Sequence, residues 1–591
     1  MAALFTTPKR NDKTSGAHFV EPDVRRRTLL AHGSWRRVTR RIVVGAVCAL
    51  TVSSLLMPSV SLAAEWVDVG GSRYGAGTAA GDEAGTWSWN GADDMKLNGY
   101  NGGAIEAAGK LNVNYSGNNA VANDSGSGIR VTDGANEDAD LNIQGDASST
   151  LNVTSSSDAI WSEGDINIDG AGTVNATSAE GDAIDAKGDL TIKGSGNVNA
   201  TGDSDGIRAD DNITIDNSGT VTAKATEDQG IDAHENLTIK GGGKVEASSA
   251  EDNAIWVSGN IEIAGGSQVK ASSEEDSAVE AKGGLAVTNA SLNANGAGYG
   301  VYTYKGITFD GATVTVRASA GSGEASALFT DEDDIFIKNG SIVDAFAEGQ
   351  FSTAISTRNH DPNGAGGHIC ISDSVVKAIA RYVESDSDGP DHYSNDQSGA
   401  VIPEHRGVNI GIFARTEEGI TPATISIVRS KVTAEGDTAA IFALATSADG
   451  GTIGTIEIEG APIQTPAGGK IIDYYRYEEE YGRGISYEVG QTIGTGDAVI
   501  NSPYNEAVAK STVIAPPEEI KPEEKPGETK PEGSKSEGTK TTKTVAVAAT
   551  GAKTTGKLAA TGDASNAAIV AAALAGTAAI AAGAVVSRKR S

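Results

Sequence analysis

The sequence has very little of what stabilises small secreted domains or forms redox and metal centres. Its 591 residues include two cysteines, Cys48 and Cys370, and seven histidines. We expect Cys48 to lie in a removable leader, which would leave Cys370 alone and exclude a disulfide within the chain. Neither a CxxC pair nor an HExxH motif is present, and no glycine-rich loop has phosphate-binding spacing. Stability must therefore come from packing and backbone hydrogen bonds.

Positive charge is also scarce. The formal net charge is -32 at pH 7, and an acidic surface of this kind repels the phosphates of nucleic acids. We therefore predict that nucleic acid is not a partner. Apolar residues at three- and four-residue spacing, typical of amphipathic helices, are absent from the central region.

What the sequence does have is a repeat. The segment QGIDAHENLTIKGGGKVEASS (229–249) is similar in sequence to the earlier segment DAIDAKGDLTIKGSGNVNATG (182–202). Successive units align at 23- or 24-residue intervals on Ile160, Ile184, Ile207, Ile231, Ile255 and Val279. Each unit carries three short apolar pairs at alternating spacing, as in Ile184/Ala186, Leu190/Ile192 and Val198/Ala200. Alternation indicates strands with one buried face. We predict an all-β, right-handed, three-sided parallel β-helix with about 24 residues per rung, where a rung is one turn of three strands.

The pattern also predicts a domain organisation, which consists of a signal peptide (1–63), an N-terminal cap (64–103), the β-helix (104–475), a C-terminal cap (476–515), a Pro/Glu/Lys-rich linker (516–557) and a sorting signal (558–591). We expect the helix to become irregular after residue 320 and to contain an insertion at 357–408. The linker has almost no apolar residues and should be extended.

The two ends of the chain indicate export. Arginines precede the uncharged run IVVGAVCALTVSSLLM, and Ser61-Leu62-Ala63 offers a cleavage point before Ala64. A membrane anchor is the alternative interpretation of this run. At the other end, the uncharged stretch 567–586 is long enough to span a bilayer and is followed by Arg588, Lys589 and Arg590.

This C-terminal arrangement resembles the sorting signal of sortase-anchored surface proteins of Gram-positive bacteria. The residues that carry the resemblance are Leu558, Ala559, Ala560, Thr561 and Gly562, with Ala559 where proline is usual. The resemblance implies sortase as a partner, cleavage after Thr561, and attachment to peptidoglycan in the cell envelope. Without cleavage, the span would remain as a membrane anchor. We therefore expect the chain on the extracellular face of a Gram-positive-type cell.

One outward column of the predicted helix carries candidate binding residues. The residues that follow the aligned apolar position are Trp161, Asp185, Arg208, Asp232, Trp256, Glu280 and Tyr302, continued by Phe329. Flat aromatic rings can cover the apolar faces of sugars, and charged groups can hydrogen-bond their hydroxyls. The alternative is structural, because aromatic residues favour strands and Asp185, Arg208 and Asp232 could form a charge ladder.

A second column lies in turns, two residues before the inward apolar position. Asp158, Asp182 and Asp205 head this column. Asp is common in turns for backbone reasons, but stacked carboxylates could also hold calcium. The loop with Asp386, Asp388 and Asp391 is a further, weaker calcium candidate, and its alternative is a solvated acidic loop.

Units such as SDGIRADDNITIDNSGTVTA and the entry segment TWSWNGADDMKLNGYNGGAI resemble the repeats of bacterial carbohydrate-binding β-helix proteins. These are secreted, non-catalytic relatives of pectate-lyase-like solenoids. The resemblance spans about residues 86–320 and implies binding of a plant-type or acidic polysaccharide, with calcium in the Asp-bearing turns. Two other functions stay open: a polysaccharide lyase or hydrolase on the same fold, and a passive surface stalk or adhesin with a protein partner.

Overall fold

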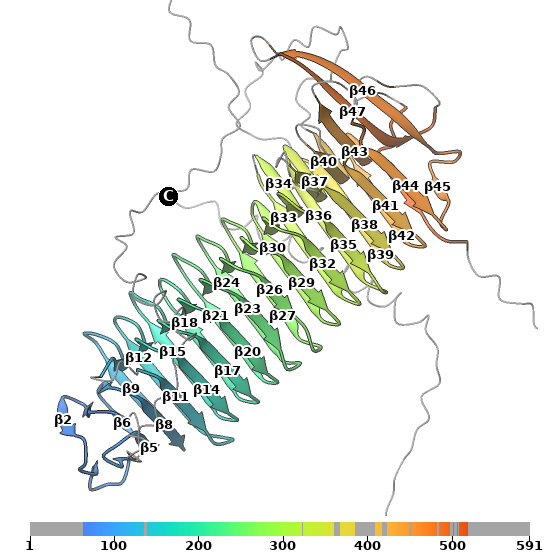
Figure 1. The fold of residues 1–591 in the computed structure, drawn as a ribbon. Helices are drawn as coiled ribbons and strands as arrows, with labels where there is room; N and C mark the ends of the chain where they lie inside the picture. The colour runs from blue at the N-terminus through green and yellow to red at the C-terminus, as the bar shows by residue number, and fades with distance from the viewer. Residues whose placement is uncertain are drawn as a thin grey trace, which may run out of the picture. The chain divides into compact units, whose positions relative to one another are not determined.

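A computed structural model describes residues 63–134, 139–321, 323–359, 367–383, 408–416, 422–447, 452–480, 484–496, 500, 505 and 507–517. Secondary structure in these residues consists of strands, and the long sheets are parallel. The chain is therefore a parallel β-helix, as the sequence predicts. Figure 1 shows strands of successive rungs following one another in rows.

The described strands form three sheets. The first sheet contains β1 (Trp66–Val69), β2 (Ser72–Gly75), β7 (Ile105–Ala108), β10 (Ile129–Thr132), β13 (Ile160–Ser162), β16 (Ile184–Ala186), β19 (Ile207–Ala209), β22 (Ile231–Ala233), β25 (Ile255–Val257), β28 (Val279–Ala281), β31 (Tyr299–Thr303), β34 (Glu324–Thr330), β37 (Phe351–Asn359), β40 (Asn409–Thr416), β43 (Ala439–Ser447), β46 (Lys470–Glu480) and β47 (Gly484–Gly494).

The second sheet contains β3 (Ala80–Gly81), β4 (Trp87–Trp89), β5 (Asp94–Asn98), β8 (Leu111–Ser116), β11 (Leu141–Gly145), β14 (Ile166–Gly170), β17 (Leu190–Gly194), β20 (Ile213–Asn217), β23 (Leu237–Lys240), β26 (Ile261–Ile263), β29 (Leu285–Thr288), β32 (Ile307–Asp310), β35 (Ile335–Lys338), β38 (His368–Ser372), β41 (Thr424–Val428) and β44 (Thr455–Glu459).

The third sheet contains β6 (Asn101–Gly102), β9 (Asn118–Asn123), β12 (Thr150–Ser155), β15 (Thr173–Ser178), β18 (Asn197–Thr201), β21 (Thr220–Lys224), β24 (Lys244–Ser249), β27 (Gln268–Ser273), β30 (Ser291–Gly296), β33 (Thr313–Ser319), β36 (Ile342–Gly349), β39 (Val375–Tyr382), β42 (Lys431–Gly436), β45 (Ile463–Thr465) and β48 (Ser511–Ile514).

The register follows the repeat. In the first sheet Ile160 pairs with Ile184, and Ile184 pairs with Ile207. The same ladder continues through Ile231 to Ile255. Because identical positions lie next to one another, each apolar column of the sequence becomes a continuous inward row. The inward residues of the unit that begins at Ile184 are buried, with at most 2% of their surface exposed, and they form part of one hydrophobic core.

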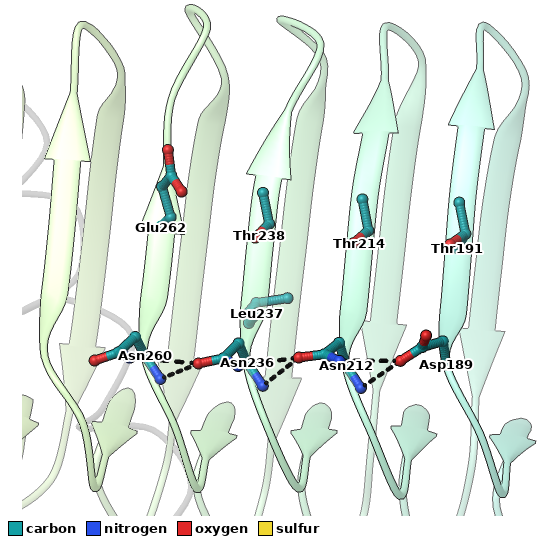
Figure 2. A pocket seen from close by; sticks show the side chains of 9 residues that line it. All are labelled: Asp189, Thr191, Asn212, Thr214, Asn236, Leu237, Thr238, Asn260 and Glu262. Atoms are coloured by element: carbon teal, nitrogen blue, oxygen red, sulfur yellow. Dashed lines mark hydrogen bonds between the residues drawn. The ribbon is translucent and has the colours of Figure 1, made fainter. Parts of the chain in front are cut away.

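A column of polar side chains marks the start of the second-sheet strands. Asn212, Asn236 and Asn260 each donate a backbone and a side-chain N–H to the side-chain oxygen of the preceding column member, and Asp189 accepts both bonds from Asn212 (Figure 2). The six N···O distances lie between 2.9 and 3.4 Å. We call these four residues the amide ladder. It ties neighbouring rungs together where each turn enters the second sheet, beside backbone bonds such as that from Leu190 N–H to the Asn212 carbonyl oxygen.

Both ends of the parallel stack meet antiparallel strands. At the N-terminal end β1 pairs antiparallel with β7. At the other end β47 and β48 pair antiparallel with β43 and β42. An open strand edge is a template for aggregation, and these antiparallel strands cover it at several places. These strands lie in the regions predicted as caps.

The structure corrects two predicted limits. Residues 357–408 are not a single insertion, because β38 and β39 lie inside this range and continue the second and third sheets. Ile369 and Ile371 pair with Ile335 and Ile337 of the preceding rung and continue the inward apolar rows there. The parallel stack also ends earlier than residue 475, since β46 (Lys470–Glu480) already pairs antiparallel with β47.

Several sequence-based predictions concern residues outside the described ranges. These are the leader up to Leu62, the acidic loop with Asp386, Asp388 and Asp391, the linker beyond Pro517 and the sorting signal. At the predicted cleavage point, Ala63 forms a bridge with Lys110 and Ala64 is buried. Within the described ranges, no helix has the length and apolar character needed to cross a membrane.

Glycine is required where the backbone of one rung approaches the next. A β-carbon at Gly219 would lie 2.1 Å from the carbonyl oxygen of Gly196, and one at Gly243 would lie 2.4 Å from that of Gly219. The neighbouring atoms are backbone, which cannot move aside without breaking the stack. In contrast, a β-carbon at Gly298 would meet no atom within 4 Å.

We therefore expect Gly219→Ala to lower the melting temperature and Gly298→Ala to leave it nearly unchanged. The clash at Gly219 should cost about 1–3 kcal/mol, the usual range for overpacking. Thermal unfolding followed by circular dichroism measures both variants. Equal melting temperatures for Gly219→Ala and the parent chain would contradict the close approach of the rungs.

Candidate functional site

The predicted outward column of the first sheet is one continuous row in the structure. Trp161 pairs with Asp185, Asp185 with Arg208, and Arg208 with Asp232. The row continues through Trp256, Glu280, Tyr302 and Phe329. We call these eight residues the first-sheet column. Their neighbours within each strand are buried inward residues, most of them apolar, so the strand alternation aims the column side chains outward.

Arg208 lies at the centre of a charge network. Its guanidinium nitrogens lie 3.7 Å from an oxygen of Asp185, 3.4 Å from one of Asp232 and 2.9 Å from one of Asp210. Burial opposes the positive charge, but these carboxylates outweigh it and raise the pKa of Arg208. Asp185 and Asp232 are only 3% and 5% exposed. They therefore position Arg208 rather than present free carboxylates to solvent, as the charge-ladder alternative expects.

A second outward row runs beside this column and was missed from the sequence. It lies two residues further along the chain, directly after each strand ends, and includes Lys187, Asp210, His234, Lys282 and Tyr304. Lys187 Nζ lies 2.7 Å from Asp185 Oδ2, and His234 Nε2 lies 3.1 Å from Asp232 Oδ2. The bond to Asp232 raises the pKa of His234. The repeat was the available signal, because it places a residue at this position two residues after the column residue of each rung.

The two tryptophans of the column carry cations at their rings. The Arg130 guanidinium lies 4.9 Å from the Trp161 ring centroid, and Lys282 Nζ lies 5.1 Å from that of Trp256. His234 meets the Trp256 ring edge-on at 5.9 Å. Both tryptophans are half-buried, so part of each indole remains open. Cation–π contacts fix the orientation of such rings.

An aromatic cluster continues the column beyond Glu280. Tyr302 stacks on Phe329 with centroids 5.5 Å apart and an interplanar angle of 17°. Tyr299 and Tyr304 each lie 5.1 Å from the Tyr302 ring. Phe329 is 8% exposed, whereas Tyr302 remains half-buried. Tyr302 is therefore the more accessible ring of this stacked pair.

The turn column of Asp158, Asp182 and Asp205 is a backbone-capping ladder. The backbone N–H of Asp182 donates to Asp158 Oδ1 at 3.1 Å, and that of Asp205 donates to Asp182 Oδ1 at 2.9 Å. The backbone N–H of Gln229 donates to Asp205 Oδ1 in the same way, at 2.8 Å. The turn interpretation accounts for these bonds. Among the described residues, no group of three or more His, Cys, Asp or Glu is arranged to hold a metal ion.

Burial favours the protonated form of three carboxyl groups, two in the turn column and one in the first-sheet column. Burial, with smaller contributions from Asp232 and Asp182, raises the pKa of Asp205 to about 9. Burial likewise raises the pKa of Asp182 to about 6 and that of Glu280 to about 7. A carboxyl group whose pKa is higher in the folded chain stabilises folding at low pH, and this contribution is lost as the pH rises towards the folded-state value.

We therefore expect Asp205→Asn to raise the melting temperature at pH 8 by at least about 2 °C and to have little effect at pH 4. Asparagine keeps the oxygen that accepts the Gln229 N–H, and Asn253 already occupies this turn position two rungs further on. Melting curves between pH 4 and pH 9 test this. Asp189→Asn is the matched control, because Asp189 accepts the same kind of backbone bond, from Asn212 N–H, at an exposed position of the amide ladder. A variant that is less stable at pH 8 would show that charged Asp205 is needed, for instance to hold a cation.

Comparison with known proteins adds one finding. A search of curated proteins and a search of solved structures each return no match. A family model described as "Carbohydrate-binding domain-containing protein" matches residues 95–242 and 182–387. The matched residues cover the rungs that carry the first-sheet column and the amide ladder, and the match supports a carbohydrate-binding role for this part of the chain.

Proposed function

We propose that this chain is a secreted, surface-anchored, non-catalytic protein whose β-helix binds polysaccharide through the first-sheet column. The observation that carries the proposal is the register, which aligns Trp161, Arg208 and Trp256 in one outward row. Trp161 and Trp256 are four rungs apart, or roughly 19 Å at about 4.8 Å per rung. The carbohydrate-binding family match covers all of these positions.

The roles within the column differ. The half-open indoles of Trp161 and Trp256 offer flat apolar surface to sugar rings. Arg208 is held by Asp185 and Asp232 and retains N–H groups for sugar hydroxyls. Glu280 and Tyr302 extend the row and add an acceptor and a further ring. Asp185 and Asp232 act as positioning residues, since both are buried.

A non-catalytic role fits the same geometry. A lyase or hydrolase needs carboxylates or a base that reach the substrate. Asp185 and Asp232 are engaged with Lys187, Arg208 and His234. The family description names binding and no reaction.

Secretion and anchoring are proposed from the two ends of the sequence. The basic leader with its cleavage point before Ala64, and the Leu558–Gly562 motif with its apolar span and basic end, would export the chain and join it to the envelope. The Pro/Glu/Lys-rich linker (516–557), which lies between the β-helix and this motif in the sequence, would hold the β-helix away from the wall.

We expect the double substitution Trp161→Ala and Trp256→Ala to weaken polysaccharide binding at least about tenfold, because aromatic anchors dominate binding energy. Pull-down by insoluble polysaccharides and a glycan array, both with the purified full-length chain, measure the effect. Phe336→Ala is the matched control, because Phe336 is a 40% exposed aromatic on the second sheet. Equal loss in both variants, or retained binding in the double variant, would contradict this site.

Calcium is a separate variable of the same experiment. Asp158, Asp182 and Asp205 stay candidates for calcium, although one carboxylate oxygen of each already accepts a hydrogen bond from a backbone N–H in the next rung. If calcium fills these turns, a chelator should lower both the melting temperature and glycan binding. Identical results with calcium and with chelator would remove calcium from the proposal.

A further inference from the structure

A groove follows the outer face of the second sheet, whereas the first-sheet column lies on the preceding strand of each rung. Its volume is about 500 Å³, and it is lined by the amide ladder, Leu237, Thr191, Thr214, Thr238 and Glu262. Figure 2 shows the three threonines in one row above the ladder, one on each successive rung. The row is part of the strand register, since Thr191 pairs with Thr214 and Thr214 with Thr238.

We propose that this groove is a second glycan-binding surface that holds one uncharged, extended polysaccharide chain along the helix axis, with about one sugar per rung. The inference rests on the carbohydrate-binding role proposed above. It assigns a different face of the solenoid and a different class of contact, with hydroxyl and amide groups in place of aromatic rings.

The first argument is the repeat of the groove. Three successive rungs present the same set of groups, a threonine hydroxyl and methyl beside an Asx side chain, and the fourth presents Asn260 with Glu262. Rungs are about 4.8 Å apart. A β-1,4-linked pyranose chain in extended form advances by a similar length with each sugar. Neighbouring sugars of such a chain are turned over relative to one another, so a ligand of this kind could place one sugar on each rung and repeat the same contact on every second rung. A globular ligand could not.

The second argument is that the floor of the groove is already ordered. The side-chain amides of Asn236 and Asn260 are held by bonds of 3.0 and 3.4 Å to the preceding ladder residue. An amide nitrogen has two N–H groups, so each of these residues keeps a second one outside the ladder. Side chains that are fixed before binding lose little entropy when a ligand arrives.

The third argument is charge. The groove contains carboxylates at both ends, Asp189 and Glu262, and Glu235 lies 3.2 Å from the Asn212 amide nitrogen. Its lining residues include no Lys or Arg. An anionic polymer would be repelled here, and the long polar row favours a neutral chain rich in hydroxyls.

The test uses the purified full-length chain and isothermal titration with a length series of neutral β-1,4-linked gluco-oligosaccharides. We expect affinity to rise with length and to level off near four sugars, because the ladder spans four rungs at about 4.8 Å each. Thr214→Glu should weaken binding at least about tenfold by filling the groove and adding charge. The fold should accept this change, since Glu262 already occupies the same row.

Thr222→Glu is the matched control. Thr222 is an outward threonine on the third sheet, and its partner one rung further on is Glu246, so the same substitution is tested away from the groove. It should leave binding of the oligosaccharides unchanged. Should Thr214→Glu unfold, Thr214→Val with Thr238→Val keeps the shape and removes the hydroxyls, and it should weaken binding by a smaller factor.

The outcomes separate this inference from the proposed function. Loss in Thr214→Glu with normal binding in Thr222→Glu and in the Trp161/Trp256 double variant supports the groove. Unchanged binding in Thr214→Glu overturns it, and so does failure of neutral oligosaccharides to bind while another glycan binds through the tryptophans. If no glycan of any class binds, the proposed function fails as well.

Discussion

Every feature of this protein depends on one constraint: in a stack of rungs, each residue lies next to the equivalent residue of the neighbouring rungs. A side chain is therefore selected by whether it tolerates its own copies at about 4.8 Å. Isoleucine and valine pack well in this way, which explains the inward rows. Asparagine also suits the constraint, because its amide is both donor and acceptor and can bond to an identical neighbour. Glycine is selected at corners where a β-carbon would strike the carbonyl oxygen below.

Carboxylates meet the same constraint less easily. On the first sheet the chain separates Asp185 from Asp232 by Arg208, so that opposite charges alternate along the column. In the turn column no such alternation exists, and Asp182 and Asp205 follow one another directly. Backbone N–H groups compensate part of their charge, but burial keeps the pKa of Asp205 near 9. The turn is thus ordered at some cost in stability at neutral pH, and in the next two rungs Gln229 and Asn253 occupy the position without that cost.

The repeat made the fold class and the first-sheet column predictable, because a fixed period assigns each residue both a strand and a side. The second outward row with Lys187 and His234 was missed, because these residues follow the ends of their strands, where alternation no longer determines the direction of a side chain. The groove on the second sheet was harder to predict. Its residues are ordinary threonines and asparagines, and its hollow depends on how far the turns project, which the period does not fix. The insertion predicted at 357–408 was drawn too wide, because the spacing between strands changes there, whereas the alternation of Ile369 and Ile371 continues the repeat into β38.

The constraint also bears on how such a molecule can bind. A solenoid of this kind has a packed interior, so recognition must occur on outward rows that are shallow and repeated. A shallow row gives little energy per contact, but a polymer ligand can make the same contact on several rungs at once, and contacts within one ligand reinforce one another. Affinity then depends on how many consecutive rungs keep the same outward residue. An Asx residue is kept at this position from Asp140 to Asn260, and the amide ladder is the part of it that lines the groove. The threonine row covers three of these rungs and ends at Glu262. The length of uninterrupted sequence repeat would therefore set the length of glycan that this face can hold.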